Sequence, residues 1–218
     1  GRIGRPVYAR IFSHSGAWLP GTQHEPDHRF YRWPRTILYD WGTHHVDVLR
    51  FLFGNIETVY ARTAGLHPEM AADDRALVLL TFCDDPRLTA VIDLSWSSFA
   101  SEGHTDRHGQ LLEAVRIEGE EGAIQFLSRG PGDELIRVTT AEGVEEIPAY
   151  TGAPFDTYRL SYVLALDHFV SALLAGVRTE TDAADNYETL SATLAAYEAA
   201  QRNQVVTVAE YQARQEAT

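Results

Sequence analysis

The sequence predicts an α+β domain in which helices cover one face of an open, mostly antiparallel β-sheet. Three observations lead to this prediction. Strand-like alternation of apolar and polar residues fills the middle of the chain, and helical spacing of apolar residues occurs only before and after it. Strands and helices are thus segregated, whereas a doubly wound fold alternates them. Because such a sheet leaves its other face open, an apolar open face predicts a homo-oligomer.

The elements follow from this pattern in chain order. A first strand is expected over residues 7–12, and a long loop rich in Gly, Pro, His and Trp over residues 13–35. A helix is expected over 40–53, where Gly54 stops it. Further strands are expected at 56–63, 76–83, 88–99, 111–118, 123–127, 135–140 and 144–147.

The clearest hairpin joins the strands at 76–83 and 88–99 through the turn at 84–87. Two long helices are expected at 158–176 and 182–203, before a short terminal strand at 205–208.

Length and composition are those of one globular domain, residues 1–218, with 44% hydrophobic and 22% charged residues. The formal charge of −13 argues against nonspecific nucleic-acid binding and against binding to anionic membranes. The single cysteine, Cys83, excludes an internal disulfide and fits a cytoplasmic location. No apolar stretch reaches the ~18 to 20 residues that would span a bilayer.

The chemistry is concentrated at the start of the first helix, in Asp40-Trp41-Gly42-Thr43-His44-His45-Val46-Asp47. Asp40 and His44 are four residues apart, which puts them on one face of a helix. A carboxylate beside an imidazole can move a proton near neutral pH. One interpretation makes His44 a general acid/base and Asp40 the residue that orients it or binds a substrate hydroxyl. The alternative makes Asp40 the N-cap of the helix and His44 a packing residue.

The neighbouring polar residues carry similar alternatives. Asp47 could hydrogen-bond His44, but a structural role that ties the helix to a neighbouring segment is favoured. His45 points about 100° away from His44 and is either a substrate contact or a satisfied polar residue. Aromatic, arginine and histidine side chains nearby suit sugar recognition or plain packing: Trp18, Arg32, Trp33, Arg35, Trp41, Glu102 and His104.

No metal site is expected. The pair His24 and His28 is interrupted by Pro26, so a helical arrangement of these two ligands is disfavoured, and cysteine ligands are absent. His104 and His108 form the other histidine pair at this spacing.

The Asp-x-Gly-x-His-x-x-Asp motif of residues 40–47, followed by an apolar helix and a glycine, resembles the C-terminal domain of Gfo/Idh/MocA oxidoreductases. The resemblance covers nearly the whole chain. Other segments that carry it are residues 1–10, Leu94-Ser95-Trp96, residues 115–124, residues 169–198 and Val205-Val206-Thr207-Val208.

The resemblance implies hydride transfer between NAD or NADP and a sugar, cyclitol or related hydroxy compound. It gives His44 and Asp40 the proton-transfer roles and puts Trp41 at a substrate-facing position. It also implies an N-terminal dinucleotide-binding domain with a catalytic lysine, yet the sequence has no lysine and no Gly-x-Gly-x-x-Gly, so no cofactor-binding residue is assigned. We therefore expect the chain to be part of a longer enzyme and inactive alone. Two rival classes are a non-catalytic carbohydrate- or partner-binding module and a metal-dependent hydrolase or isomerase.

Overall fold

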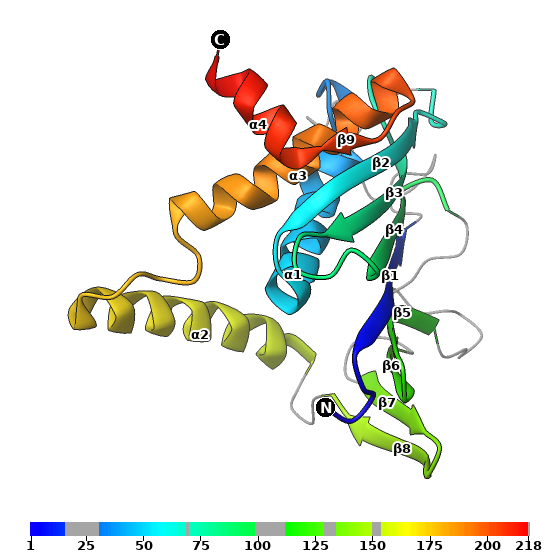
Figure 1. Cartoon of the computed structure of the whole chain (residues 1–218), viewed down its shortest axis with the longest axis vertical. Helices are drawn as coiled ribbons and strands as arrows, with labels where there is room; N and C mark the ends of the chain where they lie inside the picture. The colour runs from blue at the N-terminus through cyan, green and yellow to red at the C-terminus, as the bar shows by residue number, and fades with distance from the viewer. Residues whose placement is uncertain (16–30, 69, 99–111, 129–133, 150–153, 218) are drawn as a thin grey trace.

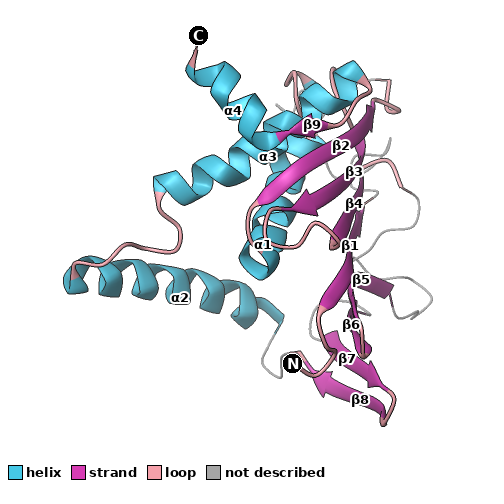
Figure 2. Cartoon of the chain, in the orientation of Figure 1, coloured by secondary structure: helices cyan, strands magenta, loops and turns pink. Residues whose placement is uncertain are grey.

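The computed structural model describes residues 1–15, 31–68, 70–98, 112–128, 134–149 and 154–217. These residues form a sheet of nine strands with the order β8-β7-β6-β5-β1-β4-β3-β2-β9, and helices lie on one side of it (Figures 1 and 2). The strands are β1 (Pro6–His14), β2 (Ile56–Ala64), β3 (Arg75–Phe82), β4 (Thr89–Ser95), β5 (Leu112–Gly119), β6 (Gly122–Ser128), β7 (Glu134–Thr140), β8 (Gly143–Pro148) and β9 (Val206–Thr207).

Strand pairing agrees with the predicted architecture. β3 and β4 form the expected antiparallel hairpin, in which Arg75 pairs with Ser95 and Thr81 with Thr89. The sheet has one parallel pair among its described strands, β1 with β4, and its other pairs are antiparallel. β1 lies between β4 and β5, so the first strand of the chain joins the two halves of the sheet.

The helical elements are the π-helical turn η2 (Leu38–Gly42), α1 (Thr43–Phe53), α2 (Pro154–Ala175), α3 (Ala183–Arg202) and α4 (Val208–Glu216). The short terminal strand predicted at 205–208 is present only as β9, and α4 begins at Val208. That prediction placed Val208 in the strand because Val is β-branched. It also missed α4, which is short and mostly polar.

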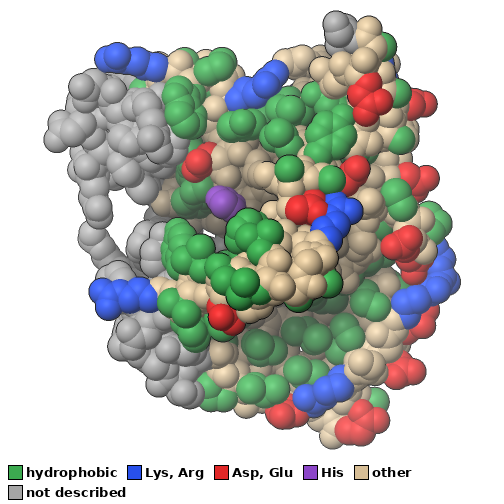
Figure 3. All heavy atoms as spheres, turned by 90° about the vertical axis from the view of Figure 1, so that its left-hand side faces the viewer, with side chains coloured by type: hydrophobic (Ala, Val, Ile, Leu, Met, Phe, Trp, Pro, Cys, Tyr) green, Lys and Arg blue, Asp and Glu red, His purple; other side chains and the backbone are tan. Residues whose placement is uncertain are grey.

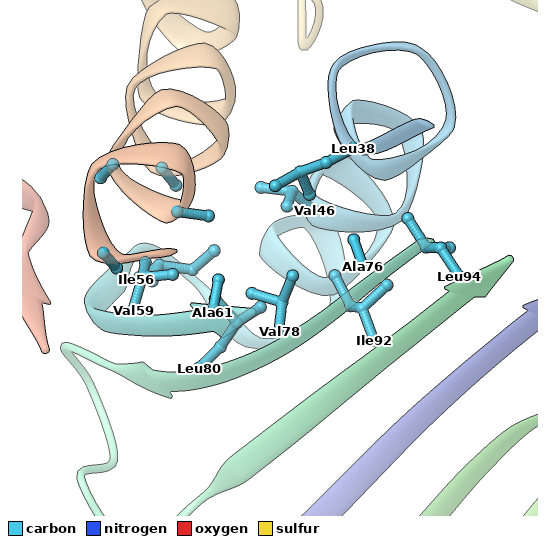
Figure 4. Packing of buried hydrophobic residues seen from close by; sticks show 14 of the residues in the cluster. Leu38, Val46, Ile56, Val59, Ala61, Ala76, Val78, Leu80, Ile92 and Leu94 are labelled. Carbon is cyan, nitrogen blue, oxygen red and sulfur yellow. The ribbon is translucent and has the colours of Figure 1, made fainter. Parts of the chain in front are cut away.

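The core lies between the sheet and the layer of η2, α1 and α3. Alternate residues of β3 and β4 point toward the helices, and Figure 4 shows Leu38 and Val46 above Ala76, Ile92 and Leu94. α3 contributes small buried side chains that allow a helix to approach a sheet closely: Ala192, Ala195, Ala196 and Ala199. The other set of alternate residues on β3 faces away from the core, with Leu77 49% and Leu79 43% exposed.

α2 projects away from this layer (Figure 1). Its apolar side chains are exposed on all sides of the helix: Leu160, Tyr162, Val163, Leu164, Leu166, Phe169, Val170, Leu173 and Leu174. Figure 3 views the molecule from the side where α2 projects and shows hydrophobic side chains there, with a hollow below them. A helix that is apolar all round is ordinarily buried, so α2 requires a partner surface. None of the described helices has the length and hydropathy that a bilayer crossing requires.

Candidate functional site

The residues of the motif lie on a helix with an irregular beginning. Leu38–Gly42 form a π-helical turn, and regular α-helix follows from Thr43 to Phe53. The prediction of a helix is correct, but the assumption of regular α spacing between Asp40 and His44 is wrong, because Asp40 belongs to the wider turn. Such turns often occur at functional sites.

Gly42 explains how this turn fits against the sheet. A Cβ atom at this position would lie 2.7 Å from Cδ1 of Leu38 and 3.4 Å from Cδ1 of Leu94. Both leucines are fully buried. Glycine therefore leaves room for the buried Leu38 side chain within the turn that carries Asp40 and Trp41.

The helix N-terminus is capped by Asp73, from the connection between β2 and β3. Oδ1 of Asp73 accepts a hydrogen bond from the amide of Thr36 at 3.1 Å, and Oδ2 accepts one from the amide of Leu38 at 3.1 Å. The alternative in which Asp40 caps the helix is wrong. The amide of Asp40 already donates to the Thr36 carbonyl at 2.8 Å, so Asp40 lies inside the helix.

Asp73 is itself held by a tyrosine of α3. The hydroxyl of Tyr197 lies 3.0 Å from both carboxylate oxygens of Asp73 and donates to the carboxylate. Burial raises the pKa of Asp73, although the amides of Leu38 and Thr36 oppose this shift. Burial, and then the charge of Asp73, raise the pKa of Tyr197, so the phenol stays protonated and can donate.

His44 and Asp47 extend from the first turns of α1. The side chain of His44 is exposed, and Asp40 is half-buried. Asp47 accepts a hydrogen bond from the Thr189 hydroxyl at 2.8 Å. The structural role favoured for Asp47 is therefore confirmed, since it ties α1 to α3.

His45, unlike His44, has its ring nitrogen Nε2 buried. This atom has no hydrogen-bond partner among the described residues. Burial, and then the proximity of His44, lower the pKa of His45 to about 4. His45 is therefore neutral at pH 7, and the interpretation of His45 as a satisfied polar residue is wrong for this nitrogen.

The predicted substrate-binding residues are distributed unevenly. Trp41 packs edge-on against the buried Trp96, with 5.5 Å between ring centroids, and Trp33 is also packed against the core. Arg32 is exposed, and the Arg35 guanidinium lies 5.5 Å from the ring centroid of Tyr197. Predicted residues that lie outside the described part of the chain are Trp18, His24, His28, Glu102, His104 and His108.

A second imidazole–carboxylate pair lies on the open face of the sheet. Nε2 of His14 is 3.0 Å from Oδ1 of Asp93, and the His14 ring stacks on Phe12 with 3.8 Å between centroids. Sequence reasoning missed this pair because the two residues are 79 positions apart and meet only through the parallel pairing of β1 with β4.

Sequence reasoning also missed Asp73 and Tyr197. The available signals were weak: an acidic pair, Asp73 and Asp74, just before a buried strand, and a tyrosine on the buried stripe of α3, where a hydroxyl requires a partner. Across the described ranges, no three His, Cys, Asp or Glu side chains converge on a point that could hold a metal ion.

Comparison with known proteins identifies the domain type. Residues 1–125 match the family model described as the GFO/IDH/MocA C-terminal domain. A D-apiose dehydrogenase from Rhizobium rhizogenes is 28% identical over 211 residues, which are 95% of this chain and 58% of that relative. A D-apiose dehydrogenase from Paraburkholderia graminis is 27% identical over 212 residues, 94% of this chain and 52% of that relative. The chain thus spans little more than half the length of these relatives.

Solved structures agree on the fold. An oxidoreductase from Agrobacterium radiobacter, in complex with NAD+, L-tartaric acid and magnesium, superposes with a TM-score of 0.76 at 27% identity, over 96% of this chain and 59% of that one. A levoglucosan dehydrogenase, in complex with NADH and levoglucosan, superposes with a TM-score of 0.74 at 18% identity, over 95% of this chain and 60% of that one. The second likeness supports the fold alone.

Proposed function

Because this chain belongs to the GFO/IDH/MocA family through its C-terminal domain, we propose that the whole protein is an NAD- or NADP-dependent oxidoreductase that acts on a sugar, cyclitol or related hydroxy compound. The observation that carries this proposal is the exposed His44 on the helix that begins with the Asp40 turn, within a segment that matches the family model. The similarity to two D-apiose dehydrogenases favours a sugar as the substrate class.

In the proposed mechanism, His44 accepts the proton of the reacting hydroxyl during oxidation and returns it during reduction. Its exposed ring can reach a substrate, and an imidazole exchanges protons near neutral pH. Asp40, one turn earlier, binds the hydroxyl or orients the ring. Arg32, Trp33, Trp41, His45 and His104 complete the proposed substrate site. The nicotinamide cofactor supplies the hydride chemistry when it is bound.

We assign no cofactor-binding residue to this chain and propose that a dinucleotide-binding domain elsewhere in the protein holds the cofactor. Two observations support this division. The relatives are much longer than the part that this chain matches. α2 also exposes apolar side chains on all its sides, as a helix does when the surface that covers it is absent.

We also propose that the protein forms a homo-oligomer through the open face of the sheet. β3 presents exposed leucines there, and they lie beside Val91 of β4, with Leu79 directly opposite it. Exposed apolar side chains on the open face of an antiparallel sheet are a common contact surface between copies of a chain.

The test of the proposed reaction is His44→Ala in the full-length protein. We expect a loss of ~100-fold or more in kcat for oxidation of a sugar substrate, because a positioned general acid/base contributes 10²- to 10⁴-fold. The measurement is NAD(P)H absorbance under saturating cofactor. A control is Gln201→Ala, an exposed position of α3, which should leave kcat unchanged. Near wild-type turnover by the His44 variant would refute the assignment.

A further inference from the structure

The first amides of the site helix are satisfied by two residues from distant elements. A helix cannot satisfy its first N–H groups internally, so partners must come from elsewhere. Here the amides of Thr36 and Leu38 donate to the Asp73 carboxylate, and the amide of Ile37 donates to the Asp73 carbonyl at 3.2 Å. The amide of Tyr39 donates to the hydroxyl of Tyr197 at 3.1 Å.

Each backbone amide of residues 36–39 thus has a hydrogen-bond acceptor in Asp73 or Tyr197. The next amide, that of Asp40, donates within the helix to the Thr36 carbonyl. The Tyr197 hydroxyl both donates to Asp73 and accepts from Tyr39, so it joins α3, the β2–β3 connection and the π-helical turn in one network. Asp73 and Tyr197 are 7% and 6% exposed, which protects the network from competition with water.

We propose that Asp73 and Tyr197 are positioning residues that determine where Asp40 and His44 stand relative to the sheet. The catalytic consequence rests on the function proposed above, whereas the structural part does not. Asp73 and Tyr197 hydrogen-bond the amides of the residues immediately before Asp40. A displacement of either side chain would therefore displace the π-helical turn. Small misplacements of catalytic groups cost large factors in rate.

The sharpest variant is Tyr197→Phe, which deletes one oxygen and leaves the Tyr39 amide without its acceptor. In the full-length protein, we expect hydrogen exchange of the Tyr39 amide to accelerate by about tenfold, because its hydrogen bond is lost. We expect kcat to fall about tenfold while KM changes less than about threefold, because the substrate still binds but the reacting groups are misplaced.

The matched control is Tyr60→Phe. It removes a phenol oxygen that donates to Asn203 at 2.8 Å on an exposed part of β2. This variant should keep wild-type kcat and wild-type exchange in residues 36–44. As a second variant, Asp73→Asn replaces one acceptor with a donor that faces the cap amides and should accelerate the exchange of the Thr36 and Leu38 amides.

The outcomes separate this inference from the proposed reaction. Unchanged exchange at Tyr39 in Tyr197→Phe overturns the positioning role, whatever the activity. If exchange of the Tyr39 amide accelerates in Tyr197→Phe but kcat is unchanged, Tyr197 does not contribute to catalysis. A wild-type protein without turnover on any sugar defeats the proposed reaction, and the exchange data then still decide whether Tyr197 holds the turn.

Discussion

Two adjacent histidines show how strongly local burial controls side-chain chemistry. His44 is exposed and available for proton transfer, whereas the His45 ring is largely buried with an unpartnered nitrogen. Burial lowers the pKa of His45 to about 4, which keeps the second imidazole neutral beside the first. The two imidazoles thus carry at most one positive charge at neutral pH, in the first turn of α1, which follows the π-helical turn that contains Asp40.

This difference predicts a pH-dependent stability. The unfolded chain binds a proton at His45 near pH 6.5, but the folded chain binds it only near pH 4. Lowering the pH through this window therefore favours the unfolded state. The pKa shift corresponds to at most ~3 kcal/mol of the free energy of unfolding between pH 7 and pH 4.

Urea unfolding of the wild type and of His45→Gln measures this loss, because the variant lacks the titrating ring. Asp73, whose pKa is raised by burial, has the opposite sign near pH 4, but it is common to both proteins and cancels in the difference. Identical pH profiles for the two proteins would contradict the prediction.

At the scale of elements, α3 acts as the support of the site helix. Tyr197 reaches its beginning, and Thr189 and Asp185 reach its C-terminal half through Arg50. The Arg50 side chain is 7% exposed, and its guanidinium donates to the Thr189 hydroxyl at 2.6 Å, the Asp185 carboxylate at 3.0 Å and the Asn55 side chain at 2.8 Å. α3 thus contacts the site helix near both of its ends.

Arg50→Lys tests this support. Lysine keeps the charge but cannot reproduce the planar fork, so it cannot keep the contacts with the buried Thr189 hydroxyl, the partly exposed Asp185 and the exposed Asn55 together. We expect the free energy of unfolding to fall by about 1–3 kcal/mol, measured by urea denaturation. The control is Arg202→Lys, an exposed arginine of α3 paired with Glu198, which should change stability by less than ~0.5 kcal/mol. Equal changes in the free energy of unfolding for Arg50→Lys and Arg202→Lys would show that the hydrogen bonds of the Arg50 guanidinium do not stabilise the fold.

At the scale of the whole molecule, two surfaces expose many large apolar side chains to solvent. One is α2, which exposes apolar side chains on all sides, and the other is the open face of the sheet around Leu77 and Leu79. They lie on opposite sides of the helical layer and the sheet (Figure 1), so one can contact another domain while the other contacts another copy. This geometry agrees with a two-domain oligomeric enzyme as proposed above.

Leu79→Arg tests the sheet surface. A charge at this position must be buried without a partner if two sheets pack face to face, so we expect the full-length oligomer to dissociate at micromolar concentration. Light scattering after size-exclusion chromatography measures the mass. Leu66→Arg places the same charge on an exposed connection and should keep the wild-type mass. A monomeric wild type, or an unchanged mass for Leu79→Arg, would contradict the proposal.

Much of this architecture can be predicted from local patterns. The predicted strands match β1 to β8 to within a few residues, except that the strand predicted over 88–99 ends at Ser95 as β4. The hairpin of β3 and β4 and the two long helices are also correct. The helix with Asp40 and His44 was found because its polar residues and the apolar face lie within a few turns of each other. Such features depend on spacing along the chain, which the sequence displays directly.

What the sequence alone determined is therefore the set of elements, their segregation into sheet and helices, and the candidate proton-transfer residues on one helix. Only the tertiary structure decided that Asp73 rather than Asp40 caps that helix, that Tyr197 and Arg50 connect it to α3, and that His14 meets Asp93. The partners in these contacts are 35 to 158 positions apart. They meet because β1 is inserted between β4 and β5 and because α3 returns across the sheet, and no local periodicity encodes that order.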